Sequence, residues 1–126
     1  MAGERILIVD DDPLNTRLLE DVLRHHDYVV QSVGDGQACI DATPDFRPAV
    51  ILMDIHMPVM GGVETITRMR ARPEFAGLRF IALTASVMPH EIASFRAVGF
   101  DAFHAKPINI AALVKEIEAL VAPSAP

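Results

Sequence analysis

The chain has 126 residues, a length typical of one domain, and 51% of them are hydrophobic, which excludes an intrinsically disordered protein. Seventeen acidic residues against eleven Lys and Arg give a net charge of −6, and the basic residues are scattered, so we expect no direct contact with nucleic acid or an anionic membrane. The sequence has no uncharged stretch long enough to cross a membrane, no pattern of a secretory signal and only one cysteine, Cys39, which predicts a cytoplasmic protein.

The first quarter of the chain reads as a buried strand followed by an amphipathic helix. The apolar run 6–9 has no polar residue on either face, as expected for a strand of a parallel sheet. Asp12 followed by Pro13 predicts the start of a helix, with Asp12 acting as its cap and not as a metal ligand. The apolar side chains of this helix form one predicted stripe, made of Leu14, Leu18, Leu19, Val22 and Leu23.

The same alternation continues to the end of the chain. A weak strand at 28–30 precedes a helix that Asp35 and Gly36 open, and a strong strand pattern follows at 50–53. Further strands are predicted at 80–83 and, more weakly, at 102–105. The remaining helices are predicted around Val63 to Met69, from Ile92 to a stop at Gly99, and from a cap at Asn109 to Val121.

Five strand–helix units in succession predict an α/β fold, with a five-stranded parallel sheet covered by helices on both faces. No linker or repeat divides the chain, so residues 1–126 are expected to form a single domain. The prolines in 122–126 cannot continue the last helix, and we predict a short disordered tail there.

Polar residues stand where each strong strand ends, which is where ligands bind in such folds. Asp10 and Asp11 follow the first strand, Asp54 follows the third, Thr84 ends the fourth and Lys106 follows the fifth. If the first and third strands are neighbours, the three carboxylates meet, and each pair about 5 Å apart repels by about 3 kcal/mol at an effective dielectric constant of about 20. A hard cation such as Mg²⁺ relieves this repulsion, and the set predicts a phosphoryl site with a carboxylate nucleophile.

Four motifs occur together in chain order: Asp10-Asp11, the segment from Leu52 to Glu64, Leu83-Thr84-Ala85, and Lys106-Pro107. With these motifs the chain resembles the receiver domain of two-component response regulators, over residues 5 to about 121 and of the single-domain type. The resemblance implies a doubly wound, flavodoxin-like sheet with strand order 2-1-3-4-5.

The resemblance also implies a role for each site residue. Asp54 corresponds to the phosphoacceptor. Asp11, Asp54 and the backbone carbonyl of His56 correspond to direct ligands of Mg²⁺, and Asp10 acts mainly through a water molecule. We do not expect the His56 imidazole itself to bind a metal, because no second His or Cys stands at ligand spacing.

Three further residues are implied to respond to phosphorylation. Thr84 and Lys106 correspond to contacts of the phosphoryl oxygens, and the Lys106-Pro107 peptide is expected to be cis. Phe103 stands at the position of the switch aromatic residue, where many members have Tyr. Phe103 has no hydroxyl group, so we expect the switch to depend on burial of the ring alone.

The implied function is phosphorelay signalling. The phosphoryl donor is a sensor histidine kinase or a histidine phosphotransfer protein, and the domain catalyses only its own phosphorylation and dephosphorylation, so it is not an enzyme with a separate substrate. The acyl phosphate then biases a surface that binds a downstream protein. We expect a monomer or a weak, phosphorylation-dependent dimer.

The donor has to reach Asp54, so the rim of the site is the expected docking surface. Candidates on the first helix are Leu14, Asn15 and Leu18, and Pro107 and Ile108 lie beside the lysine. Asn15 is predicted to be exposed there, whereas Leu14 and Leu18 could instead belong to the core.

Three other functions fit the sequence less well. A phosphatase of the haloacid dehalogenase type needs a second acid two residues after its nucleophile, and His56 occupies that position. A flavin-binding domain needs a phosphate loop that Asp10 to Asp12 would repel. An unphosphorylated binding module predicts missing site residues, whereas all are present. His56 and Ser86, two residues beyond Asp54 and Thr84, are predicted to govern the approach of a hydrolytic water.

Overall fold

The computed structural model describes residues 3–57, 60–85 and 88–121, so the predicted tail at 122–126 lies outside the described residues. One five-stranded parallel sheet has the order β2-β1-β3-β4-β5, which confirms the predicted fold. Its strands are β1 (Arg5–Val9), β2 (Val29–Val33), β3 (Val50–Asp54), β4 (Arg79–Thr84) and β5 (Ala102–Ala105). The helices are α1 (Pro13–His25), α2 (Gly36–Phe46), α3 (Gly62–Arg70), α4 (Pro89–Val98), α5 (Ile110–Val121) and the short 3₁₀ helix η1 (Pro73–Phe75).

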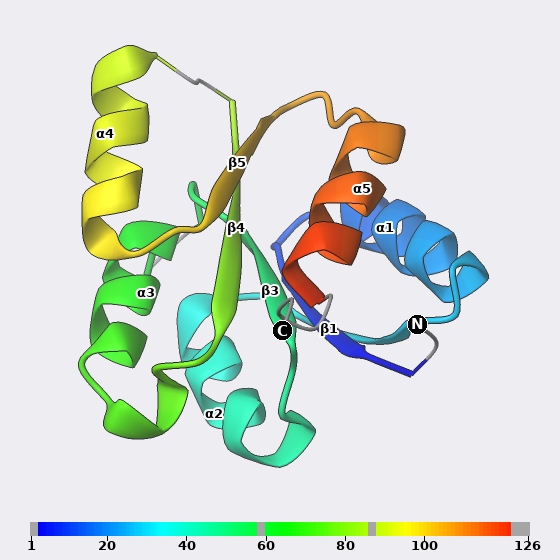
Figure 1. Ribbon diagram of the computed structural model, residues 1–126, viewed down its shortest axis with the longest axis horizontal. Helices are drawn as coiled ribbons and strands as arrows, with labels where there is room; N and C mark the ends of the chain where they lie inside the picture. The colour runs from blue at the N-terminus through cyan, green and yellow to red at the C-terminus, as the bar shows by residue number, and fades with distance from the viewer. Residues whose placement is uncertain (1–2, 58–59, 86–87, 122–126) are drawn as a thin grey trace, which may run out of the picture.

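Helices cover both faces of the sheet, with α2, α3 and α4 on one side and α1 and α5 on the other (Figure 1). Because side chains alternate along a strand, Leu7 and Val9 of β1 pack under α2 and α3, whereas Ile6 and Ile8 pack under α1 and α5. All four are fully buried. This two-sided burial explains why the central strands are continuous apolar runs. Burial of each large side chain stabilises the folded state by about 1.5–3 kcal/mol.

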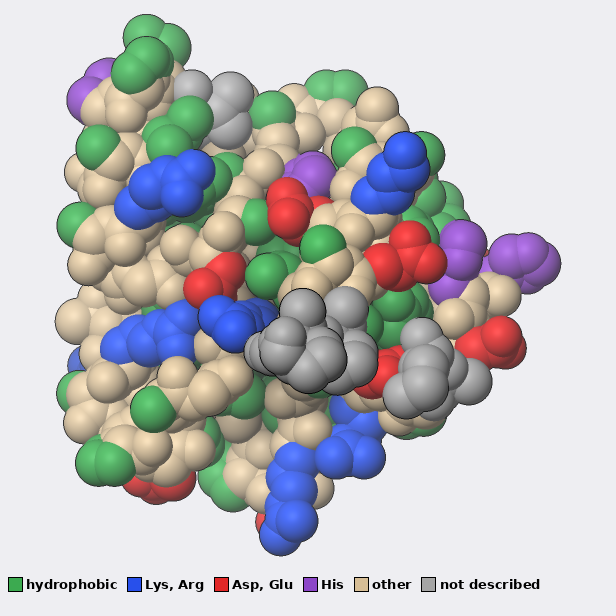
Figure 2. Space-filling view, in the orientation of Figure 1, with side chains coloured by type: hydrophobic (Ala, Val, Ile, Leu, Met, Phe, Trp, Pro, Cys, Tyr) green, Lys and Arg blue, Asp and Glu red, His purple; other side chains and the backbone are tan. Residues whose placement is uncertain are grey.

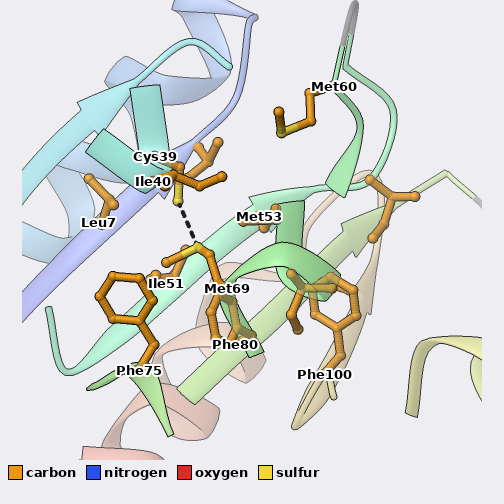
Figure 3. Packing of buried hydrophobic residues seen from close by; sticks show 14 of the residues in the cluster. Leu7, Cys39, Ile40, Ile51, Met53, Met60, Met69, Phe75, Phe80 and Phe100 are labelled. Carbon is orange, nitrogen blue, oxygen red and sulfur yellow. Dashed lines mark hydrogen bonds between the residues drawn. The ribbon is translucent and has the colours of Figure 1, made fainter. Parts of the chain in front are cut away.

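The core under α2 and α3 includes the chain's one cysteine (Figure 3). The Cys39 thiol lies 3.8 Å from the sulfur of Met69, and burial raises the pKa of this thiol to about 12, with the Thr43 hydroxyl opposing the rise. The thiol is therefore protonated and enclosed, as expected for a small core residue. Phe75 of η1 fills the same core, and the sequence patterns did not predict this short helix.

The helix ends follow the predicted capping residues. The Asp12 carboxylate accepts a hydrogen bond from the first turn of α1, which confirms its role as a cap, and Asp35 and Asn109 do the same for α2 and α5. Gly99 ends α4 with φ of 113°, a left-handed conformation that favours glycine.

The predicted apolar stripe of α1 is wrong at its beginning. Leu19 and Leu23 are buried, but Leu14 is 79% exposed and Leu18 is 52% exposed. Successive residues of a helix are about 100° apart, so the face of α1 that contains Leu19 and Leu23 also contains Asn15. Leu14 and Leu18 lie at least about 100° away from Leu19 and Leu23 around the helix axis. Two large apolar side chains are therefore left on the surface at the start of this helix.

Charged side chains are distributed over the surface. On the face seen in Figure 2, Lys and Arg side chains form separate groups with acidic side chains between them, so this face carries no continuous basic surface. Among the described residues, none of the helices has the length and apolar character needed to cross a membrane.

Candidate functional site

The parallel register brings the polar strand ends to one edge of the sheet. β1 pairs with β3, so Asp10, the residue after β1, lies beside Asp54 at the end of β3. β4 pairs with β5, and the Lys106 N–H donates to the Thr84 carbonyl at 2.8 Å. Four predicted site residues from four different strands are thus assembled by the sheet itself.

Three carboxylates gather at this edge. Asp10, Asp11 and Asp54 each offer an oxygen, and these oxygens all lie within 4.8 Å of one another. Asp10 and Asp54 are buried with 4% exposure each, whereas Asp11 is exposed. Oxygens of this kind and number suit a hard divalent cation such as Mg²⁺, which relieves the repulsion between them.

One lysine faces the acids. The Lys106 ammonium lies 3.2 Å from Asp54 Oδ2 and 4.0 Å from Asp10 Oδ2, and its side chain is one-third exposed. A single positive charge offsets only part of three negative charges. The cluster keeps a net affinity for further positive charge.

The pKa of Asp54 is raised, and burial of its carboxyl group is the main cause. The His56 N–H, which donates to Asp54 Oδ1 at 3.1 Å, and the Lys106 ammonium both lower the pKa, and the nearby Asp10 raises it further. A raised pKa means that the surroundings of Asp54 disfavour its ionised form. A bound cation would supply the missing compensation.

Both oxygens of Asp10 accept hydrogen bonds from the start of α1. The Asp12 N–H donates to Oδ1 at 2.9 Å, and the Asn15 amide donates to Oδ2 at 2.6 Å. Asn15 is therefore half-buried and directed at the site, so the prediction that it is exposed is wrong, while its predicted contact with the phosphoryl donor stays a prediction. The cap at Asp12 places Asn15 in the first turn of α1, close in sequence to Asp10, but no pattern in the sequence specifies this hydrogen bond.

The remaining loop residues lie around this cluster. Thr84 is fully buried at the end of β4, and His56 is exposed just beyond Asp54. The Lys106-Pro107 peptide is cis, which confirms that prediction. Ser86 lies outside the described residues, so its predicted role near the hydrolytic water stays a prediction.

Phe103 of β5 lies half-buried against α4. Its ring centroid is 6.0 Å from that of Phe95, and the Arg96 guanidinium lies 4.9 Å above the Phe103 ring. A cation over an aromatic ring stabilises this contact by about 0.5–1 kcal/mol at an exposed site. The ring is therefore held by α4 in this conformation.

The chain matches the sequence profile of the response regulator receiver domain over residues 6–118. It is 29% identical over 113 residues to the polar-differentiation response regulator DivK of Brucella anthropi, covering 90% of this chain and 92% of that protein. It is 31% identical over 116 residues to the DNA-binding response regulator MtrA of Mycolicibacterium smegmatis, covering 92% of this chain but only 50% of MtrA.

Solved structures show the same architecture. The chemotaxis response regulator CheY4 of Vibrio cholerae superposes with a TM-score of 0.89 at 26% identity, covering 95% of this chain and 100% of CheY4. The receiver domain of the sensor histidine kinase PA1611 of Pseudomonas aeruginosa, which holds a magnesium ion in its active-site cleft, superposes with a TM-score of 0.85 at 31% identity, covering 94% and 98% of the two chains. With this fold, these motifs and this profile match, the chain belongs to the response regulator receiver domain family and acts in phosphorelay signalling.

Proposed function

We propose that this domain accepts a phosphoryl group on Asp54, in a Mg²⁺-dependent reaction, from a phosphohistidine of a sensor histidine kinase or a histidine phosphotransfer protein. The observation that carries the proposal is the juxtaposition of three carboxylates within 4.8 Å and the Lys106 ammonium 3.2 Å from Asp54. A buried carboxylate with a purely structural role requires neither a cation site nor two further acids beside it. A phosphoryl acceptor needs both the cation site and the lysine, because they stabilise the charge of the phosphoryl oxygens.

The donor set fits Mg²⁺. Asp11 is exposed and accessible to a direct ligand role, the Asp54 carboxylate becomes available when the Lys106 ammonium shifts away from it, and the His56 carbonyl would complete the protein ligands. Both oxygens of Asp10 already accept hydrogen bonds from the chain, which supports contact through water instead. When bound, the ion would neutralise the carboxylates and the oxygens of the incoming phosphoryl group.

The transfer itself is a single displacement. A carboxylate oxygen of Asp54 forms a bond to phosphorus as the phosphorus–nitrogen bond of the donor breaks, and the electron pair of that bond returns to the imidazole nitrogen. Lys106 is free to shift from the Asp54 carboxylate to a phosphoryl oxygen, and the Thr84 hydroxyl supplies a further donor. Hydrolysis of the acyl phosphate by water, past the exposed His56, would return Asp54 to its carboxylate form.

Phosphorylation is proposed to act on the face formed by α4, β5 and α5. When Thr84 moves toward the phosphoryl group, space opens beside the sheet that the Phe103 ring can fill. Inward movement of the ring has to break its contact with Arg96, so α4 responds as well. This changed face is the surface proposed for the downstream partner or a second copy of the chain.

Beryllofluoride with Mg²⁺ is expected to reproduce this switch, because it imitates a phosphoryl group on a carboxylate. Amide chemical shifts in NMR spectra are expected to change around Asp54, at Thr84, and along α4 and β5 including Phe103. Shift changes confined to the Asp54 loop, with none from Met88 to His104, would contradict a switch through this face.

The exposed apolar side chains of α1 are proposed to contact the phosphoryl donor. Leu14 and Leu18 lie at the start of the helix that follows Asp10 and Asp11, and Pro107 and the half-buried Ile108 lie on the other side of the site. Exposed apolar residues next to a reaction centre are typical of an interface.

Substitution Leu14→Ala is expected to slow phosphoryl transfer from the cognate donor about five- to tenfold, the effect of removing an interface contact of more than about 1 kcal/mol. Labelling by acetyl phosphate should not change, because that donor needs no docking. Val29→Ala is the matched control, since Val29 is 48% exposed and lies at the start of β2, at the end of the sheet away from the site. Equal transfer rates for both variants and the native chain would exclude Leu14 from the interface.

We also propose that the chain acts as one domain in the cytoplasm. The described residues share one sheet with both faces covered, and the only cysteine is a buried free thiol, both of which support this proposal.

A further inference from the structure

We infer that Asn15 is a positioning residue of this site, whose amide fixes the Asp10 carboxylate in the orientation that the cation site requires. The inference rests on the proposed function, because it assigns a role within that site. It starts from one contact, the 2.6 Å hydrogen bond from Asn15 Nδ2 to Asp10 Oδ2.

Asp10 cannot obtain this hydrogen bond from solvent. Its side chain has no exposed surface, so each carboxylate oxygen depends on donors from the chain. The Asp12 N–H holds Oδ1 and the Asn15 amide holds Oδ2, and two bonds to two oxygens define the plane of the carboxylate. With only the Asp12 bond left, the carboxylate is free to rotate about its last side-chain bond.

Asn15 also decides where the lysine lies. Lys106 Nζ is 4.0 Å from the same Asp10 Oδ2, and 3.2 Å from Asp54 Oδ2. Because the Asn15 amide already satisfies Asp10 Oδ2, the ammonium leans toward Asp54, where the proposed chemistry takes place. Without the amide, the buried Asp10 Oδ2 would compete with Asp54 Oδ2 for the Lys106 ammonium, because a buried carboxylate oxygen without a donor is costly.

The misplaced ion pair would compete with the cation. Mg²⁺ would then bind only to the fraction of molecules in which the Asp10 carboxylate has the competent orientation, and its apparent dissociation constant rises by the reciprocal of that fraction. A role limited to the stability of α1 would leave this constant unchanged. Mg²⁺ affinity in the absence of any phosphoryl donor therefore separates positioning from structural support.

The test compares Asn15→Ala and the similarly sized Asn15→Leu with the control Asp21→Ala, a truncation of an exposed side chain further along the same helix. Calorimetric titration is expected to show Mg²⁺ bound about fivefold more weakly by both Asn15 variants, and with native affinity by the control. Labelling by acetyl phosphate should slow at subsaturating Mg²⁺ and recover at saturating Mg²⁺. Native Mg²⁺ affinity in either folded Asn15 variant, whatever its unfolding midpoint, would overturn the inference.

A second experiment tests whether Asn15 acts through Asp10. In an Asp10→Ala background the additional Asn15→Ala substitution is expected to leave Mg²⁺ affinity unchanged, because the carboxylate that it orients is gone. A further fivefold loss in that background would overturn the assignment. If the native chain binds no Mg²⁺ and is not labelled by acetyl phosphate, the proposed function fails together with the inference. If the native chain binds Mg²⁺ and is labelled, but Asn15→Ala binds Mg²⁺ with the same affinity, only the inference fails.

Discussion

Asp54→Asn is expected to abolish labelling by acetyl phosphate with Mg²⁺, under conditions in which the native chain gains one phosphoryl group by intact-mass spectrometry. The carboxylate oxygen is the nucleophile in the proposed displacement, and a neutral amide is too weak a nucleophile to replace it. Removal of the cation with EDTA should abolish labelling of the native chain as well. Asp41→Asn, a change of an exposed acid on α2, is the matched control and should label normally.

The same variant should remain folded, and the pKa of Asp54 gives the direction of the stability change. Because the pKa in the folded protein is raised, the ionised carboxylate costs stability once the pH exceeds that pKa, and costs none below the usual range of an aspartate. Metal-free Asp54→Asn should therefore unfold at a higher denaturant concentration than the native chain at neutral pH, with the difference disappearing in acid. Full labelling of this stable variant would exclude Asp54 as the only acceptor.

Gly62→Ala is expected to lower the free energy of unfolding by about 2 kcal/mol, the typical cost of overpacking, and to slow labelling. A Cβ atom at Gly62 would lie 2.8 Å from the Asp54 carbonyl oxygen and 3.0 Å from Ile55 Cα. Both are backbone atoms, so the clash is relieved only by moving the end of β3, which carries the acceptor. This cost exceeds the gain of about 0.4–1 kcal/mol that Ala brings by restricting the unfolded chain.

Gly77→Ala is the matched control for that experiment. A Cβ atom at Gly77 would meet nothing within 4 Å, so the same chemical change should leave the denaturation midpoint nearly native. Circular dichroism is a suitable probe, because the chain contains no tryptophan. Equal midpoints for the two variants would show that the β3–α3 connection tolerates a side chain at Gly62.

The central strands were predictable because burial on both faces leaves a strong pattern. The runs containing Ile8 and Leu52 have no polar residue, and few structures other than an interior parallel strand accommodate such a run. The site residues were predictable for a related reason. A charged residue directly after such a strand, as at Asp10 and Asp54, has to lie at the edge of the sheet.

Contacts that depend on the rotation of a helix were not predictable in the same way. Leu14 and Leu18 fit an apolar stripe by spacing, but the stripe is defined by the side chains that reach the sheet, and these begin at Leu19. Asn15 was predicted to be exposed because a polar residue usually is, yet its partner Asp10 lies before the helix and is buried. Apolar periodicity carries no information on such a polar contact.

The charge balance of the site has a consequence for magnesium supply. Asp10, Asp11, Asp54 and Lys106 together carry about two negative charges at neutral pH, and conversion of Asp54 to an acyl phosphate adds about one more. A divalent cation should therefore bind the phosphorylated domain more tightly than the unmodified one. Thermodynamic linkage requires phosphorylation and magnesium binding to favour each other by the same factor. Saturation of the site with magnesium should therefore shift the phosphorylation equilibrium toward the acyl phosphate by that factor. A fall in free magnesium would then weaken the signal with no change in the phosphoryl donor.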